Sequence, residues 1–348
     1  MDAARAAQEA PARVGLGRAR FTRDQVADRV GLEHEELVRW WRAMGFAEVP
    51  ADEVAFSDSD VEMGRRLWQL VQSGAVDDDS VLRMARLYGA SFSRIGAAQA
   101  ALLDEVGTGS GSSLDEDDVV DLLRDAMLYV WRRHLTAALG AWEGEEVDAE
   151  LAVGFADVSR FSTISKDLAP DELAELVDGF EVAAFDVVAG HGGRVVKLIG
   201  DEVMFVADAV PTAVDIGLDL IDRMAASPVA VQLHCGVALG PVVTVGGDVF
   251  GDTVNLASRL TGVARRGRVV LPRDDADELH DRPDLEVRRV RRVVDLKGFG
   301  RTRLVAVSRA EVESRAEVES RSEVEEPPPA DEPADEIADA ADVTPESG

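Results

Sequence analysis

Two aspartates at the ends of apolar runs carry the chemistry that the sequence indicates first. Asp157 closes the run LAVGFAD, and Asp201 closes the run VVKLIGD. A carboxylate beside a buried strand loses hydration, and a cation or hydrogen bonds must offset that cost. Carboxylate oxygens suit Mg²⁺ or Mn²⁺, so the pair is a candidate site for divalent metal. Taken singly, either aspartate is more commonly a residue that starts a turn.

Further segments accompany this pair in a fixed order. Lys197 lies four residues before Asp201, the segment GDVFGDTVNLASR spans 247–259, and DLKGFG spans 295–300. Four separated motifs in one order are far more specific than any single short pattern. Over residues 148–308 they resemble the class III nucleotidyl cyclases, in particular the adenylate cyclases.

The resemblance implies a metal centre and a nucleotide site. Asp157 and Asp201 would bind two Mg²⁺ or Mn²⁺ ions, with help from the backbone carbonyl of Val158. Lys197 and Asp248 would recognise the base, and Lys297 would contact the phosphates. Asn255 and Arg259 would stabilise the transition state. The implied reaction is attack of the ribose 3′-hydroxyl of ATP on its α-phosphorus, which yields 3′,5′-cyclic AMP and pyrophosphate.

Each implied role is chemically reasonable. Adenine presents an acceptor at N1 and a donor at N6, so a Lys donor and an Asp acceptor complement it, whereas guanine presents the reverse pattern. Asn255 and Arg259 are four residues apart in a predicted helix and therefore share one face. A guanidinium suits a phosphoryl group that gains charge. Each residue also has an ordinary alternative: Lys197 as a strand lysine, Arg259 on a helix surface, Lys297 in a loop.

One position departs from the family pattern. The family usually has glycine where the run DVSRFS places Arg160. This side chain either adds a phosphate contact or alters the loop. Its consequence would concern nucleotide affinity rather than the class of enzyme.

The resemblance also implies a homodimer. In this family the metal pair comes from one catalytic domain and the transition-state pair from the other. This chain carries both sets, which implies two equivalent sites related by a two-fold axis. A small rotation of the domains would separate the two sets and regulate activity.

Composition excludes several classes of protein. The 348 residues carry a formal net charge of −30, with a sequence pI near 4.5. This acidity argues against nucleic acid and against an anionic membrane surface as partners. No window approaches the ~18 apolar residues of a spanning helix, and a single Cys allows no internal disulfide. We therefore expect a cytoplasmic protein without stable membrane insertion.

The chain is expected to divide into five parts. These are a disordered N-terminus (1–20), an all-α regulatory domain (21–113), a linker helix (114–147), an α+β catalytic domain (148–308) and a disordered acidic tail (309–348). The catalytic order βαββαβ predicts a ferredoxin-like sheet with helices on one face, including strands at 229–238 and 242–246. A loop is predicted at 107–113. Residues 308–348 contain 14 acidic and 3 basic residues, which disfavours a packed structure.

The N-terminal region allows more than one interpretation. A short helix, the turn Val30–Leu32 and a second helix are also typical of a helix–turn–helix DNA reader, although the acidity disfavours it. We expect a regulatory domain that responds to a small molecule, a lipid or protons. His134, beside two arginines in the linker helix, is the preferred pH-sensing candidate over His34 and His191, although each of the three is more commonly an ordinary surface histidine. Overall, an active adenylate cyclase is favoured over a catalytically silent nucleotide-binding protein and over a DNA-binding regulator.

Overall fold

A computed structural model describes residues 14–108, 115–140 and 149–310. The chain forms two units: residues 1–149 with 242–250, and residues 150–241 with 251–348. The predictions of a disordered acidic tail and of most of the disordered N-terminus concern segments that lie outside the described residues.

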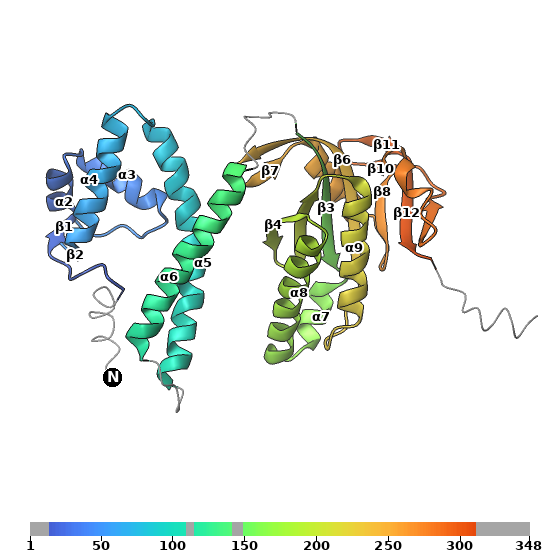
Figure 1. The fold of residues 1–348 in the computed structure, drawn as a ribbon, viewed down its shortest axis with the longest axis horizontal. Coiled ribbons are helices and arrows are strands. Elements are labelled where there is room, and N and C mark those ends of the chain that lie inside the picture. Colours follow the sequence, from blue (N-terminus) through green and yellow to red (C-terminus); the bar gives the residue numbers. More distant parts are fainter. Residues whose placement is uncertain (1–13, 109–114, 141–148, 311–348) are drawn as a thin grey trace, which may run out of the picture. The chain divides into compact units, whose positions relative to one another are not determined.

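The N-terminal unit is mainly helical (Figure 1). Its elements are, in chain order, β1 (Phe21–Thr22), α2 (Arg23–Val30), α3 (His34–Ala43), β2 (Val54–Phe56), α4 (Asp58–Gln72), α5 (Asp78–Thr108) and α6 (Glu116–Gly140). The expected all-α composition is wrong in one detail, because β1 and β2 pair as an antiparallel ribbon. Strands this short carry no alternating pattern that a sequence could reveal.

Capping and a small core explain the first helices. Thr22 accepts a hydrogen bond from the Gln25 N–H, and the Gln25 side chain accepts one from the Thr22 N–H, which forms a capping box. Trp40, Phe56 and Val61 are among the residues buried in the core of this unit. The sequence therefore has both the start signal and the apolar residues that these helices require.

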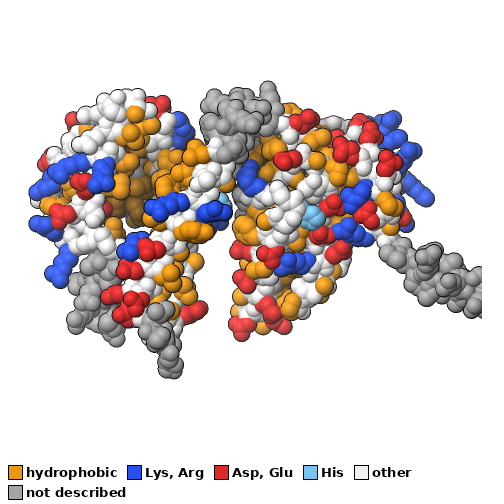
Figure 2. All heavy atoms as spheres, in the orientation of Figure 1, with side chains coloured by type: hydrophobic (Ala, Val, Ile, Leu, Met, Phe, Trp, Pro, Cys, Tyr) orange, Lys and Arg blue, Asp and Glu red, His pale blue; other side chains and the backbone are white. Residues whose placement is uncertain are grey.

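Helices α5 and α6 pack against each other but leave large apolar side chains exposed. Figure 2 shows hydrophobic side chains along α6. The loop predicted at 107–113 begins later than expected, because Gly107 and Thr108 continue α5. The rest of that predicted loop lies outside the described residues.

The second unit is built on one mixed sheet. Its first strands are β3 (Ala149–Val158), β4 (Arg194–Ile199), β5 (Glu202–Ala207) and β6 (Leu233–Val245), with spatial order β4-β5-β3-β6. This order confirms the ferredoxin-like prediction. The sheet continues beyond β6 through β8 (Val269–Pro272), β12 (Leu304–Arg309) and β9 (Leu285–Arg289).

Helices cover both faces of this sheet, which corrects the expectation of one covered face. Helices α8 (Pro170–Gly190) and α9 (Val210–Ala225) lie side by side (Figure 1). A Cβ built on Gly217 of α9 would lie 2.9 Å from Sγ of Cys235, whereas one on the next strand residue, Gly236, would meet the backbone of helix α10 (Asp252–Thr261). Successive strand residues point to opposite faces, so α10 lies opposite α9.

Strand β6 is longer than predicted. The sequence predicts two strands, at 229–238 and 242–246. The structure has one continuous strand from Leu233 to Val245, whose far end pairs with β7 (Asp248–Phe250). Gly240 has φ 157°, a value that residues with a side chain rarely adopt, so glycine allows the strand to continue here.

The remaining elements are short. They are α7 (Phe161–Asp167), the 3₁₀ turns η1 (Arg273–Asp275) and η2 (Asp277–Leu279), and the antiparallel pair β10 (Val294–Leu296) and β11 (Gly300–Thr302). None of the described helices combines the length and the apolar character that crossing a membrane requires.

Candidate active site

The structure brings Asp157 and Asp201 together. Asp157 is the penultimate residue of β3, and Asp201 lies in the turn between β4 and β5. β3 and β5 pair antiparallel, and the Val158 N–H donates to the Asp201 carbonyl oxygen at 3.1 Å. This pairing places the end of one strand beside the turn of the neighbouring hairpin, which is why residues 44 positions apart in the chain meet here.

Burial and mutual repulsion raise the pKa values of the carboxyls here. The pKa of Asp157 rises from 3.8 to about 6, first through burial and then through the negative charge of Asp201 and a hydrogen bond with it. Glu202, directly opposite Asp157 across the strand pair, has its pKa raised from 4.5 to about 7 by burial and by both aspartates. Ionising these acids in the metal-free protein is therefore costly.

These residues fit a divalent cation. The described residues contain no group of three or more His, Cys, Asp or Glu side chains arranged to hold a metal ion. Mg²⁺, however, is usually bound by one or two carboxylates together with substrate phosphates. Two crowded, partly buried carboxylates supply that chemistry, with Glu202 adding negative charge.

The metal-free protein is expected to lose stability as the pH rises from about 4 to about 7. Asp157 and Glu202 have higher pKa values in the folded protein than in the unfolded chain, so the folded state binds more protons in this window. Mn²⁺ should replace these protons and stabilise the protein near pH 7.5 but not near pH 4.5. Thermal unfolding at both pH values checks this. If Mn²⁺ raised the unfolding temperature of Asp201→Asn as much as that of the wild type, the prediction would be wrong.

Three residues beside the pair were not predicted from the sequence. Glu202 follows Asp201 directly, and the β3–β5 register would have placed it opposite Asp157. His234 Nε2 lies 3.3 Å from Asp157 Oδ2, and His234 Nδ1 lies 2.9 Å from Ser159 Oγ. The ferredoxin-like order makes β6 the neighbour of β3, so a strand-order argument could have located His234.

Burial lowers the pKa of His234, and the nearby positive charge of Arg266 lowers it further, against an opposing effect of Asp201. These effects favour a neutral imidazole. Cys235, next in the chain, is completely buried, and that burial raises the pKa of its thiol. A buried, protonated thiol is a poor nucleophile, so the cysteine offers no competing chemistry.

Arg160 stands in a conformation that favours glycine. Its φ is 64°, and among the described residues it is the one non-glycine residue with positive φ. Arg160 precedes α7 and is exposed. The departure from the family pattern therefore has a structural meaning, since a side chain is accommodated where a left-handed backbone is required.

Replacing Arg160 with glycine is expected to raise the free energy of unfolding by about 0.5–1 kcal/mol. The left-handed conformation costs a residue with a Cβ about 1–2 kcal/mol, and the greater freedom of glycine in the unfolded chain offsets part of that gain. Arg160→Ala keeps the Cβ and should give no gain. Urea unfolding of both variants checks this, and equal stability of the two would refute the backbone explanation.

The two predicted transition-state residues share the exposed side of α10. Asn255 and Arg259 are both exposed, whereas Thr253, Ala257 and Leu260 of the same helix are buried. The helix touches the sheet at Gly236, where an added Cβ would lie 2.2 Å from the Thr261 nitrogen and 2.6 Å from the Ala257 oxygen. This close approach determines the distance between α10 and β6.

The remaining predicted residues come from three separate places. Lys197 lies on β4, with Met204 of β5 as its partner in the sheet. Asp248 begins β7, and its Oδ1 accepts a hydrogen bond from the Val249 N–H at 2.8 Å. Lys297 is exposed in the turn between β10 and β11. Their roles toward a nucleotide stay predictions.

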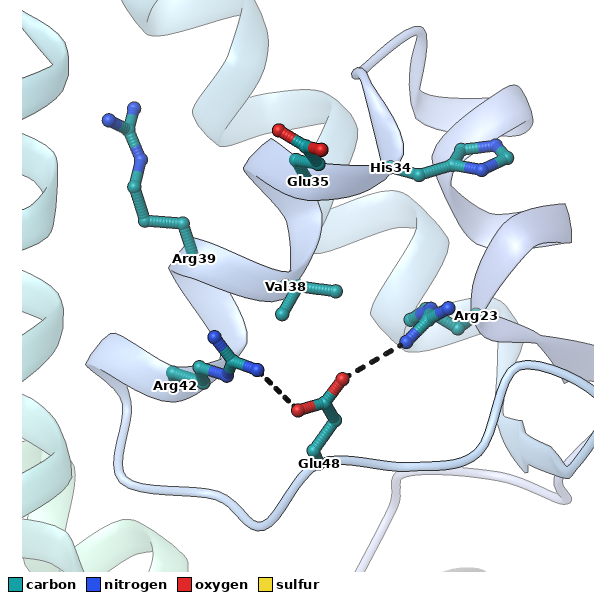
Figure 3. Close-up of a pocket in the computed structure, with 7 residues that line it drawn as sticks. All are labelled: Arg23, His34, Glu35, Val38, Arg39, Arg42 and Glu48. Atoms are coloured by element: carbon teal, nitrogen blue, oxygen red, sulfur yellow. Dashed lines mark hydrogen bonds and ion pairs between the residues drawn. The ribbon is translucent and has the colours of Figure 1, made fainter.

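A hollow lies in the N-terminal unit. It encloses about 610 Å³ and is lined by Arg23, His34, Glu35, Val38, Arg39, Arg42 and Glu48. Figure 3 shows Glu48 between Arg23 and Arg42, and both arginines pair with its carboxylate. Arg39 pairs with Asp78. These charges are neutralised within the unit, so the hollow is not a second metal centre.

Comparison with known proteins shows the family of the chain. The model of the adenylate and guanylate cyclase catalytic domain matches residues 145–308. An adenylate cyclase of Streptomyces coelicolor is 39% identical over 274 residues, which cover 75% of this chain and 72% of that protein. One from Streptomyces griseus is 37% identical over 274 residues, covering 75% and 68%. The chain is therefore an enzyme that belongs to the class III adenylate cyclases.

Proposed function

We propose that this enzyme converts ATP into 3′,5′-cyclic AMP and pyrophosphate at a site formed between two copies of the chain. The observation that carries the proposal is the Asp157–Asp201 pair, two partly buried carboxylates held together by the β3–β5 pairing. Such a pair is costly without a cation, and it lies in a chain of the adenylate cyclase family.

The aspartates, with the Val158 carbonyl oxygen, would hold two Mg²⁺ or Mn²⁺ ions. When bound, these ions supply two effects: a lower pKa for the ribose 3′-hydroxyl and partial neutralisation of the triphosphate. The contribution of the protein is to hold Asp157 and Asp201 beside each other, where a bound cation offsets the cost of ionising Asp157. The β3 strand and the β4–β5 turn do this by fixing both backbones.

Base selection is assigned to Lys197 and Asp248. The Lys197 ammonium would donate to adenine N1, and the Asp248 carboxylate would accept from the N6 amino group. With guanine the same pair would face a donor with a donor and an acceptor with an acceptor. Buried polar groups without partners are costly, so GTP should be a poor substrate. Lys297 would contact the phosphates.

Stabilisation of the transition state is assigned to Asn255 and Arg259. Both side chains leave α10 on the side turned away from the sheet, and both are exposed in the single chain. A guanidinium that must contact a pentavalent phosphorus needs to be enclosed, because charge interactions weaken in water. A second copy would supply the metal pair to this exposed pair of side chains, and a homodimer would then contain two equivalent sites.

An apolar seam on α6 supports the homodimer. Leu128, Trp131, Leu135 and Leu139 are 42%, 51%, 41% and 67% exposed. Their spacing of three, four and four residues places them on one stripe of the helix, as in the seam of a coiled coil. Exposed stripes of this kind mark association surfaces. Helix α6 also precedes β3 in the chain.

Regulation is assigned to the N-terminal unit. Movement along the α6 seam would change the distance between the metal pair of one copy and Arg259 of the other. A small molecule, a lipid or a proton acting on this unit is the proposed signal, with the Glu48 hollow as one place for a ligand and His134 as the proposed pH-sensing residue. We place the enzyme in the cytoplasm, where ATP is present, and we assign no nucleic-acid partner.

Measurement of cyclic nucleotides tests the proposed reaction. Full-length protein is incubated with ATP or GTP and with Mn²⁺ or Mg²⁺, beside an Asp201→Asn variant of similar shape but less charge. Cyclic AMP from ATP, lost in the variant, is the expected result. Binding of ATP without product under every condition would instead favour the catalytically silent nucleotide-binding protein.

A further inference from the structure

His234 joins the end of β3 to the start of β6 through two side-chain contacts. Its Nδ1 lies 2.9 Å from Ser159 Oγ, and its Nε2 lies 3.3 Å from Asp157 Oδ2. The His234 side chain is 16% exposed, and Ser159 is 7% exposed. The same two chain segments are also joined by the backbone, because the Ser159 N–H donates to the Gln232 carbonyl at 2.8 Å.

The donors and acceptors in this chain can be assigned from chemistry. Nε2 faces Asp157 Oδ2 at 3.3 Å, and an ionised carboxylate only accepts, so a hydrogen on Nε2 fits this contact. In that tautomer Nδ1 has a lone pair and accepts the hydrogen bond that Ser159 Oγ–H donates. The Asp157 carboxylate therefore favours this tautomer of His234, and the Ser159 hydroxyl, which can donate or accept, complements it.

This Ser–His–Asp group does not fit a nucleophilic triad. The hydroxyl of such a triad must be reached by a substrate carbonyl, but Ser159 is buried. Asp157 also differs from the aspartate of a triad, because Asp201 and Glu202 crowd it. The order of contacts instead resembles the outer partners of a metal site, which orient a ligand and fix its protonation.

We infer that His234 is a positioning residue that orients the Asp157 carboxylate toward the divalent cation. The inference rests on the proposed function of Asp157 as a metal ligand. With Nε2 3.3 Å from Oδ2, the imidazole restricts rotation of the Asp157 carboxylate. Without His234, binding a cation would first require Asp157 to be ordered.

Two amide variants separate the two contacts of His234. The amide nitrogen of Gln lies near the position of Nε2, so His234→Gln can still donate to Asp157. The shorter Asn places its amide near Nδ1, so His234→Asn can meet Ser159 but cannot reach Asp157. Both variants are polar and similar in shape, which makes Asn a matched control for the loss of this one contact.

Mn²⁺ binding to the full-length protein without nucleotide, followed by electron paramagnetic resonance, tests the inference. The wild type and His234→Gln should bind with affinities within about threefold, whereas His234→Asn and His234→Ala should bind about tenfold more weakly. Excess Mn²⁺ should restore kcat in His234→Asn. Thermal unfolding without metal should be alike for the Gln and Asn variants, as their shared polarity predicts.

The outcomes also separate this inference from the proposed function. If the wild type binds Mn²⁺ in an Asp201-dependent manner and His234→Asn binds equally tightly, His234 has no positioning role, while the metal site stands. If Asp201→Asn binds Mn²⁺ like the wild type, or the wild type binds none, the metal site itself is wrong and the inference fails with it. Should His234→Ala not fold, the Gln–Asn comparison still decides.

Discussion

Alanine at position 236 is expected to lower cyclic AMP formation by about a hundredfold. Gly236 lies directly under α10, and the new Cβ would come within 2.2 Å of the Thr261 nitrogen and 2.7 Å of the Leu260 carbonyl carbon. These are backbone atoms that no side-chain rotation can move, so the whole helix must shift. Asn255 and Arg259 would shift with it, and a displacement of about 1 Å can cost a hundredfold in rate.

The Gly236→Ala measurement needs a control for stability. Overpacking of this kind also costs about 1–3 kcal/mol, so thermal unfolding is measured beside kcat, at a temperature where both proteins are folded. Gly179→Ala on α8 is the matched control, since nothing lies within 4 Å of its added Cβ. Full activity in folded Gly236→Ala would contradict the account of how α10 is positioned.

Replacing two apolar residues of the α6 seam with glutamate should abolish dimerisation and, with it, most of the activity. Trp131 and Leu135 are half exposed in the single chain, and a second copy is expected to cover them. A buried, unpaired carboxylate is strongly unfavourable, so Trp131→Glu with Leu135→Glu should yield a monomer. A monomer keeps Asp157 but lacks the second copy's Arg259, and we expect activity to fall at least a hundredfold.

The seam prediction has a control on the same helix. Leu122 is 60% exposed but lies on the opposite side of α6 from the seam. Leu122→Glu introduces the same side chain, and this variant should remain an active dimer. Sedimentation and cyclic AMP formation are measured for both variants. A dimeric, active double variant would show that the seam does not hold the copies together.

The aspartate pair and the sheet order were predictable because their causes are local. Asp157 and Asp201 each end an apolar strand, and the βαββαβ order fixes which strands are neighbours. Strand and helix periodicities are properties of short segments, so they are visible without a structure. The same holds for Thr22, whose hydrogen bonds lie within one helical turn.

What the sequence did not reveal depends on contacts between distant segments. His234 meets Asp157 across 77 positions, and neither neighbour in the chain marks it as special. Gly236 resembles any strand glycine until α10 is seen above it. Helix α10 was expected on the same face of the sheet as α9, because helices on one face are the simpler arrangement for this strand order. The two strands predicted at 229–238 and 242–246 are one continuous strand in the structure.

The central claim is that each site takes its metal pair from one chain and Arg259 from the other, and complementation tests it most directly. Asp157→Ala and Arg259→Ala proteins are each expected to be inactive. After exchange in equal amounts, half of the dimers are mixed and each has one intact site, so about a quarter of wild-type activity should return. No recovery, with exchange verified by mass, would contradict the shared site.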